Sequence, residues 1–301
     1  MFTGTYTALV TPFKNGQIDE PAFRKLVQDQ IRGGVDGVVP VGTTGESPTL
    51  GFDEHVRVIE MAVEYARGRV KVLAGTGANS TEEAIHLTQA AEKARADGSL
   101  QVAPYYNKPS QKGLFQHFQK IARSTRLPLI LYSIPGRCGI YIAVDTVKRL
   151  ADRCQNVVGI KEAGGDTDRV SELRAALGPK FDILSGDDSL TLPFMSVGAD
   201  GVISVASNII PKKVAGMVQA FASGDSLGAR KLHTKFYPLF KDLFLETNPV
   251  PIKAAMAMAG RIVEEYRLPL ASMASPNRRK LTATLQALGV IQQTRASRNL
   301  K

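Results

Sequence analysis

Apolar residues along the chain fall into short runs that alternate with longer amphipathic segments, up to about residue 224. Several runs are continuously apolar, such as Leu129–Leu131 and Val157–Ile160. This pattern is typical of parallel strands that are buried on both faces of a sheet. The predicted strands are Tyr6–Thr11, Gly37–Val41, Lys71–Ala74, Leu100–Ala103, Leu127–Tyr132, Val157–Lys161, Asp182–Ser185 and Gly201–Ser204.

The segments between these runs have helical periodicity and begin with residues that favour helix N-termini. Asp19 precedes Pro21 as a predicted N-cap, and Ser80 and Glu83 have capping-box spacing. The predicted helices are Glu20–Arg32, Asp53–Tyr65, Glu82–Ala96, Gly113–Thr125, Val144–Arg153, Asp168–Ala176, Ser189–Val197 and Pro211–Ala222. Eight β-then-α units predict an α/β fold, a (β/α)₈ TIM barrel. A doubly wound sheet is the alternative, but its glycine-rich phosphate fingerprint after the first strand is missing.

No strand is predicted after Ser223-Gly224-Asp225. Three further helices are expected at Ser226–Phe244, Pro251–Ala259 and Pro276–Leu288. We therefore expect a barrel in residues 1–224 that carries the active site. A helical region in residues 225–301 is expected to pack against it, since no low-complexity linker separates the two. The last ten residues are polar and basic, and such ends commonly fray.

Composition limits the cellular compartment and the kinds of partner that we expect for this protein. The 301 residues include two cysteines, Cys138 and Cys154, which excludes a disulfide framework and favours a reducing compartment, although a single bridge between them stays open. No run reaches the roughly 18 apolar residues of a membrane span, and the N-terminus does not read as a signal peptide. We expect a cytoplasmic protein with no membrane partner.

The net charge of +10 raises the question of a nucleic-acid partner. The basic residues are spread along the chain, with their densest groups at Arg278–Lys280 and at Arg295, Arg298 and Lys301. A solvated surface explains this distribution better than a polyanion-binding stripe does. We expect no nucleic-acid partner.

A metal site is not expected either. The four histidines all fall in predicted helices, none at metal-ligand spacing from another ligand, and there is no Cys–His cluster. They are His55, His86, His117 and His233.

Candidate chemistry gathers at the ends of the predicted strands, where barrel active sites form. Lys161 ends an apolar strand, and desolvation there lowers the pKa of an amine, so that more of it is neutral and can attack a ketone to form an iminium. A structural lysine paired with Glu162, or with another barrel carboxylate, is the alternative. The loop Gly42–Ser47 offers amides and the hydroxyls of Thr43 and Thr44 to a carboxylate; phosphate is a rival ligand, but the P-loop lysine is absent.

Two phenols and a guanidinium complete the candidates. Tyr132 and Tyr106 follow neighbouring strands and could pass protons if a hydroxyl such as that of Thr44 bridges them, although single buried tyrosines are commonly core residues. Arg137, five residues after Tyr132, could hold a second carboxylate or make a surface or interface ion pair.

The motifs Gly42–Ser47, Tyr132–Arg137 and Gly159–Ala163 together resemble the pyruvate-dependent Schiff-base lyase family, which contains dihydrodipicolinate synthases and N-acetylneuraminate lyases. The resemblance runs from about Gly4 to Val290. Within the family, Tyr105–Pro109 and Arg137 favour the synthases.

The resemblance implies a condensation of pyruvate with L-aspartate 4-semialdehyde on the path to diaminopimelate and lysine. It implies an imine on Lys161, a proton relay of Tyr132, Thr44 and an adjacent subunit's Tyr106, and no cofactor. It also implies substrate contacts from Thr43, Thr44, Arg137, Gly186 and Ile203. The family's common assembly, a homotetramer built as a dimer of dimers, is expected.

A lysine effector site at a subunit interface is a further hypothesis from the resemblance. Matching positions are Ser47, His55, Asn79, Glu83 and Tyr105, but Phe52 and Pro48 replace a frequent histidine and a frequent alanine. Two rival functions stay open: an aldolase of a sialic acid, a 2-keto-3-deoxy sugar acid or a hydroxyproline-pathway keto acid, and a catalytically silent barrel that binds a small acid.

Overall fold

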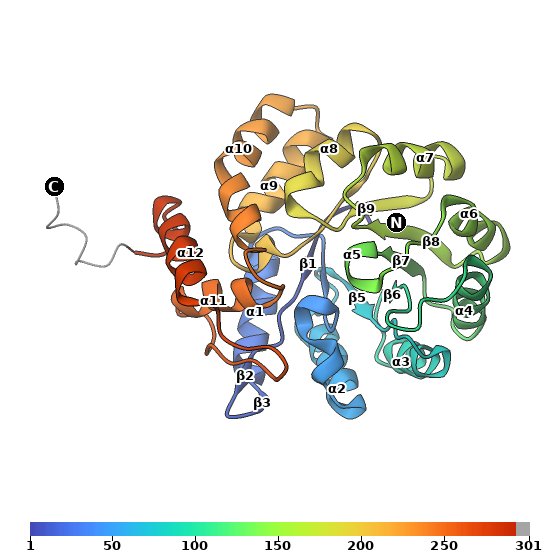
Figure 1. Ribbon diagram of the computed structural model, residues 1–301, viewed down its shortest axis with the longest axis horizontal. Helices are drawn as coiled ribbons and strands as arrows, with labels where there is room; N and C mark the ends of the chain where they lie inside the picture. The colour runs from blue at the N-terminus through green and yellow to red at the C-terminus, as the bar shows by residue number, and fades with distance from the viewer. Residues whose placement is uncertain (293–301) are drawn as a thin grey trace, which may run out of the picture.

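The computed structural model describes residues 1–292 and contains a closed barrel of eight parallel strands (Figure 1). Around the barrel the strands run in the order β1-β10-β9-β8-β7-β6-β5-β4, so chain neighbours are also spatial neighbours. The predicted TIM barrel is confirmed. The strands are β1 (Gly4–Ala8), β4 (Gly37–Val39), β5 (Lys71–Gly75), β6 (Gly98–Val102), β7 (Leu129–Ser133), β8 (Val157–Glu162), β9 (Asp182–Ser185) and β10 (Gly201–Ser204).

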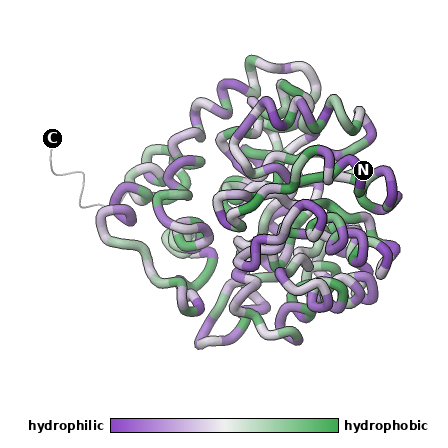
Figure 2. The backbone as a smooth tube through the Cα atoms, turned by 45° about the vertical axis from the view of Figure 1, so that its right-hand side comes forward, coloured by the Kyte–Doolittle hydropathy of each residue, from purple (hydrophilic) through white to green (hydrophobic). Residues whose placement is uncertain are grey.

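Helices cover the outside of the barrel. They are α1 (Glu20–Arg32), α2 (Phe52–Ala66), α3 (Thr81–Lys93), α4 (Gln111–Arg123), α6 (Val144–Arg153), α7 (Thr167–Leu177), α8 (Thr191–Ser196) and α9 (Pro211–Ala222). Figure 2 shows polar and apolar stretches alternating along them, as expected of helices with one face on a core. Within residues 1–292, no helix has both the length and the apolarity to cross a bilayer.

Local capping explains where predicted boundaries hold and where they shift. Asp19 caps α1, its carboxylate accepting from Ala22 N at 3.1 Å, and the predicted start is correct. The α4 helix begins two residues earlier than predicted because Ser110 caps it, accepting from Gly113 N at 3.3 Å. The α8 helix begins later than predicted because Asp187 first caps a 3₁₀ turn.

The first strand also differs from its prediction. Tyr6–Thr11 is an apolar run, but the paired residues of β1 are Gly4–Ala8, from Gly4 opposite Gly201 to Thr7 opposite Ser204. The chain after Ala8 leaves the barrel and forms a two-stranded hairpin, β2 (Phe13–Lys14) and β3 (Gln17–Ile18), which the periodicity did not predict.

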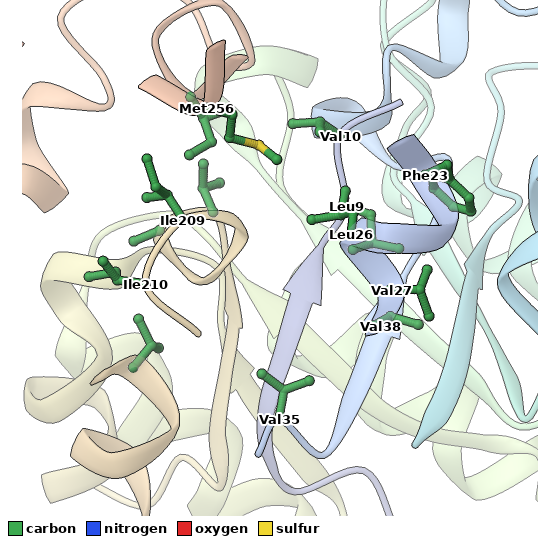
Figure 3. Close-up of a cluster of buried hydrophobic side chains, with 14 of the residues drawn as sticks. Leu9, Val10, Phe23, Leu26, Val27, Val35, Val38, Ile209, Ile210 and Met256 are labelled. Atoms are coloured by element: carbon green, nitrogen blue, oxygen red, sulfur yellow. The ribbon is translucent and has the colours of Figure 1, made fainter. Parts of the chain in front are cut away.

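The C-terminal helices are α10 (Ser226–Asp242), α11 (Val250–Met258) and α12 (Ser275–Ala287). In Figure 1, α12 lies at the side of the molecule, beyond α11. Figure 3 shows that Met256 of α11 points into the same apolar cluster as Leu9, Val10 and Ile209 from the barrel. The helical extension therefore shares a core with the barrel. The basic positions Arg295, Arg298 and Lys301 lie outside the described residues.

Candidate active site

Lys161 and Tyr132 stand side by side at the ends of neighbouring strands. They are register partners between β7 and β8, so their side chains leave the sheet at the same level. The Lys161 Nζ lies 4.1 Å from the centre of the Tyr132 ring. The exposed fraction of Lys161 is 7%, and that of Tyr132 is 5%. The strand pairing thus places an amine against a phenol inside the barrel mouth.

Burial sets the protonation of both groups. Desolvation lowers the pKa of Lys161 to about 7; the charge of Asp188 acts against this shift, and the charge of Arg137 adds to it. Desolvation raises the pKa of the Tyr132 phenol, which therefore keeps its proton near neutral pH. The pair offers a partly neutral amine beside a protonated hydroxyl, which suits imine formation.

The structural reading of Lys161 as a partner of Glu162 is wrong. The Glu162 carboxylate pairs with Arg169 Nε at 2.7 Å and accepts from Gly164 N at 2.7 Å. Successive strand residues point to opposite faces, so Glu162 points away from the barrel interior that Lys161 enters. No ion pair of Lys161 with a carboxylate occurs among residues 1–292.

Gly186 leaves room for the Lys161 stem. A Cβ at this position would lie 3.1 Å from Lys161 Cε and 2.6 Å from Ala163 Cβ. Its N–H donates to Glu162 O at 2.8 Å, so the amide does not face a ligand.

Ile203 is fully buried in β10 and packs in the same apolar cluster as Tyr132. It does not line the chamber around Lys161, whereas Gly186 does.

The loop after β4 brings Thr43 and Thr44 to this chamber in a 3₁₀ turn. A side-chain hydrogen bond from Thr43 slightly lowers the pKa of Tyr132. Thr44 instead accepts from Asn248 Nδ2 at 2.9 Å. Because Thr44 Oγ1 is the acceptor in this bond, its own O–H remains available to donate to another partner.

A buried ion pair with α11 fixes the same loop in place. Glu46, with φ of 57°, lies in the left-handed region, and its Oε1 accepts from Lys253 Nζ at 2.5 Å. Both side chains are fully buried. The Lys253 Nζ also lies 4.3 Å from the Phe13 ring centre. A residue of α11 thereby holds the threonine loop of the barrel in place.

Arg137 lies in the one-turn helix α5 (Pro135–Cys138), which directly follows β7. Its Nη2 donates to Asn248 O at 2.9 Å and to Thr247 Oγ1 at 3.4 Å. The C-terminal region thus orients this guanidinium toward the barrel mouth. The surface ion-pair reading of Arg137 is not supported, since its contacts are with a carbonyl and a hydroxyl.

Two connected chambers surround these groups. The deeper one, of about 50 Å³, is lined by Thr43, Thr44, Tyr132, Arg137, Lys161, Gly186, Phe244 and Asn248, among others. The outer one, of about 240 Å³, shares Thr43, Tyr132 and Arg137 with it and reaches Tyr105 and Cys138. A small acid entering from outside would meet Arg137 before it reaches Lys161.

Sequence reasoning missed three residues at the site: Phe244 and Asn248 line the deeper chamber, and Lys253 pairs with Glu46 of the threonine loop. They belong to the region that was expected only to pack on the barrel. One local signal existed, the Asn248-Pro249 dipeptide between two helices, which marks a turn. Asp188 was noted only as a strand-end position; its carboxylate accepts from Ser204 Oγ and from the amides of Val205 and Ala206, at 2.5 to 3.0 Å.

Tyr106 does not join the site within one chain. Its exposed fraction is 91%, and its φ of 71° turns the backbone away from the strand. Neither chamber is lined by it. The expected relay from Tyr132 through Thr44 to Tyr106 is therefore not closed within a single chain.

The candidate effector residues gather around an adjoining pocket of about 170 Å³, which shares Ser47, Pro48, Gly77 and Tyr105 with the outer chamber. Its lining includes Ser47, Pro48, Phe52, His55, Glu83 and Tyr105. Asn79 lies beside it, donating to Tyr105 O at 3.3 Å. His55 is buried with Nε2 bonded to Gly75 O at 2.8 Å, and burial lowers its pKa.

Among residues 1–292, no group of three or more His, Cys, Asp and Glu side chains could hold a metal ion.

Known proteins closely resemble this chain. Residues 1–288 match the Dihydrodipicolinate synthetase family. The chain is 50% identical over 291 residues to the 4-hydroxy-tetrahydrodipicolinate synthase of Endomicrobium trichonymphae, which covers 97% of this chain and 100% of that protein. It is 57% identical to the solved 4-hydroxy-tetrahydrodipicolinate synthase of Methylacidiphilum fumariolicum SolV, with a TM-score of 0.95 and 96% of each chain covered. A lysine-bound dihydrodipicolinate synthase of Cyanidioschyzon merolae is 40% identical, with a TM-score of 0.94, covering 96% of this chain and 99% of that one.

Proposed function

The chain belongs to the dihydrodipicolinate synthetase family, and from that premise we propose that it condenses pyruvate with L-aspartate 4-semialdehyde through an imine on Lys161. The activity of the family, 4-hydroxy-tetrahydrodipicolinate synthase, is that of a lyase, and it belongs to the diaminopimelate and lysine pathway. The observation that carries the catalytic assignment is the buried Lys161 amine, 4.1 Å from the Tyr132 ring, with a pKa lowered to about 7.

The first half of the reaction loads pyruvate. Neutral Lys161 attacks the pyruvate ketone, water leaves, and a protonated imine forms. A methyl proton then passes to the Tyr132 oxygen, which has by that stage given its own proton away, and an enamine forms with the imine nitrogen as the electron sink. The Tyr132 phenol, protonated because burial raises its pKa, donates to the departing hydroxyl. Thr43 and Thr44 bind the pyruvate carboxylate.

The second half uses the enamine carbon. It attacks the semialdehyde carbonyl, whose oxygen takes up a proton to become the hydroxyl of the product. Arg137 binds the carboxylate of the semialdehyde. The substrate ammonium group loses a proton to water, and the resulting amine attacks the imine carbon. The attacking nitrogen then passes a proton to the Lys161 nitrogen, the ring is closed, and the bond to Lys161 breaks to restore the free amine.

A two-part experiment tests this function. Borohydride and pyruvate are added to purified protein, the intact mass is read, and turnover of aspartate semialdehyde is assayed. A reduced pyruvate adduct that maps to Lys161, together with turnover, is expected. An adduct without turnover would transfer the same chemistry to a sugar-acid substrate, and the absence of any adduct would leave a silent barrel; the names of the relatives favour neither.

We propose a homotetramer, a dimer of dimers, in which a neighbour's Tyr106 completes the relay with Thr44 and Tyr132. The exposure of Tyr106 and its absence from the chambers of its own chain support this arrangement.

We also propose a cytoplasmic location, supported by Cys138 and Cys154, which are buried free thiols. The boundary at residue 224, between barrel and packed helical region, stays a prediction.

Lysine inhibition is proposed as the regulation of this enzyme. Glu83 lines the pocket beside Tyr105 and could pair with the ammonium of lysine, while Phe52, half exposed at the rim, could pack on its stem. The family resemblance includes a solved relative with lysine bound. A lysine titration is expected to lower activity by millimolar concentrations, and the Glu83→Gln variant to need more lysine. Full activity throughout the titration would refute the proposal.

A further inference from the structure

Asn248 connects the two halves of the proposed reaction. It lies between α10 and α11, its exposed fraction is 6%, and it lines the deep chamber together with Lys161. Its side-chain Nδ2 donates to Thr44 Oγ1 at 2.9 Å. Its backbone oxygen accepts from Arg137 Nη2 at 2.9 Å. One residue therefore contacts both the relay threonine and the arginine assigned to the second carboxylate.

The side-chain oxygen of Asn248 has no hydrogen-bond partner. Six buried side-chain atoms among residues 1–292 lack one, and Asn248 Oδ1 is the only one of them whose residue lines either active-site chamber. The others belong to Thr5, Gln30, Gln101, His117 and His233. A buried carbonyl oxygen without a donor is unfavourable, and such an atom calls for a partner that the free protein does not supply. A ligand that enters the chamber can supply that donor.

The second substrate carries a donor at the required place. In L-aspartate 4-semialdehyde the carboxylate and the ammonium group share one carbon. A carboxylate held by Arg137 therefore brings the ammonium group next to the residue whose carbonyl Arg137 contacts. Resting on the proposed function, we propose that Asn248 Oδ1 accepts a hydrogen bond from the α-ammonium group of the semialdehyde, and that Asn248 thereby selects 2-amino-4-oxo acids.

This contact also serves the later chemistry. Once the ammonium group has lost a proton to water, the nitrogen that Asn248 holds is the one that must attack the imine carbon on Lys161. Asn248 and Lys161 line the same chamber, so the bound substrate nitrogen lies close to the imine carbon that it attacks. The donation from Nδ2 to Thr44 fixes the amide plane, which in turn fixes the direction in which Oδ1 points.

Two substitutions distinguish the role of the Asn248 side-chain oxygen from that of its side-chain nitrogen. Asn248→Ala removes both. Asn248→Asp keeps an acceptor for the ammonium group and removes the donor to Thr44. The probe is 4-oxobutanoate, which has the carboxylate and the aldehyde of the substrate but no amine, and is used as an inhibitor. Thr247→Val is the matched control, because the Thr247 hydroxyl contacts Arg137 and not the amide.

With Asn248→Ala, KM for the semialdehyde should rise roughly ten- to hundredfold, the range for loss of a hydrogen bond to a charged group. The inhibition constant of 4-oxobutanoate should change less than about threefold, because that ligand makes no bond to Oδ1. Asn248→Asp should restore KM while kcat stays low, since the Thr44 hydroxyl is no longer oriented. Thr247→Val should weaken both ligands alike.

Equal weakening of both ligands in Asn248→Ala would overturn the inference, because Asn248 would then act only through Arg137. The borohydride adduct with pyruvate is measured for every variant and shows whether its site is folded. If the unsubstituted enzyme forms no adduct, it is the proposed function that fails. A further measurement needs no variant: the pyruvate-loaded enzyme should reach half-saturation with semialdehyde at a concentration at least about tenfold lower than with 4-oxobutanoate. Equal concentrations would also overturn the inference.

Discussion

At the scale of single residues, opposing influences set the pKa of Lys161, and the charge of Arg137 adds to the lowering by burial. Burial lowers the pKa, and the negative charge of Asp188 raises it, with the result near 7. A higher value would leave little neutral amine to attack pyruvate, and a much lower one would weaken the nucleophile. Asp188 is itself held by three hydrogen bonds from the β10 end, so its charge stays at a fixed place.

This balance predicts the pH profile of imine formation. Because the neutral amine reacts, the rate of formation of the borohydride-trapped adduct should rise with pH through about 7 and level off above it. On the acid side the fall should become shallower than tenfold per pH unit near pH 6, because burial raises the pKa of Asp188 to about 6, and a protonated Asp188 no longer raises the pKa of Lys161. Rapid-quench mass spectrometry across pH measures this rate. Asp188→Asn removes the charge that raises the Lys161 pKa, so its profile should shift to lower pH. A profile that stays level well below pH 7 in the parent enzyme would contradict the assignment.

At the scale of elements, the loop Gly42–Ser47 depends on a helix that the chain forms much later. The Glu46–Lys253 pair joins the loop to α11 with both side chains fully buried. Burial lowers the pKa of Lys253, and the charge of Glu46 opposes that shift. Such a pair adds little net stability as a unit, but each partner becomes costly when the other is removed.

Lys253→Met should therefore lower the free energy of unfolding by about 3–5 kcal/mol, because the buried Glu46 carboxylate loses its charged partner and, within residues 1–292, keeps only the hydrogen bond from Arg267 N at 3.2 Å. The double variant Glu46→Gln with Lys253→Met should recover a large part of this loss, since no charge remains buried. Chemical denaturation of the three proteins measures the difference. If the single variant unfolds at the same denaturant concentration as the parent, the pair does not stabilise the loop.

Strands and helices were predictable where the pattern is local. The apolar run Val157–Ile160 in β8 predicts a buried parallel strand. In a barrel, Lys161 then lies at the C-terminal end of the strands, where active sites form. The start of α8 was not predictable in the same way, since Asp187 first caps a 3₁₀ turn. Asn248 and Lys253 could not be recognised, because their roles depend on contacts with Thr44 and Glu46, over 200 positions away in the chain.

At the scale of the whole molecule, the proposed relay is not completed by one chain. Lys161, Tyr132, Thr44 and Arg137 are assembled within the chain, whereas Tyr106 stands at its surface. The sequence alone could suggest this arrangement only through the family resemblance, since the exposure of a side chain depends on the fold. The proposed assembly makes catalysis a property of the oligomer.

Dilution tests this dependence. Activity per chain should fall as the protein is diluted to monomers, while the pyruvate adduct on Lys161 still forms, because the amine and its surroundings belong to one chain. Tyr106→Phe should lower kcat about 10²-fold or more in the intact oligomer, as expected for loss of a proton-transfer group. Light scattering beside the activity assay gives the oligomeric state. Undiminished activity of a proven monomer would show that Tyr106 of a neighbour is not required.

The two contacts that reach back from Asn248 and Lys253 also bear on the order in which the protein matures on the ribosome. The chain emerges from its N-terminus, and the last barrel strand, β10, ends at Ser204. When those residues have left the exit tunnel, all eight barrel strands and Lys161 have been made, but the threonine loop still lacks its two partners. Only when the segment up to Lys253 has emerged do Thr44 and Glu46 gain their partners. Chains released early would thus keep the nucleophile but lack its finished surroundings, so that activity itself reports that synthesis has passed α11.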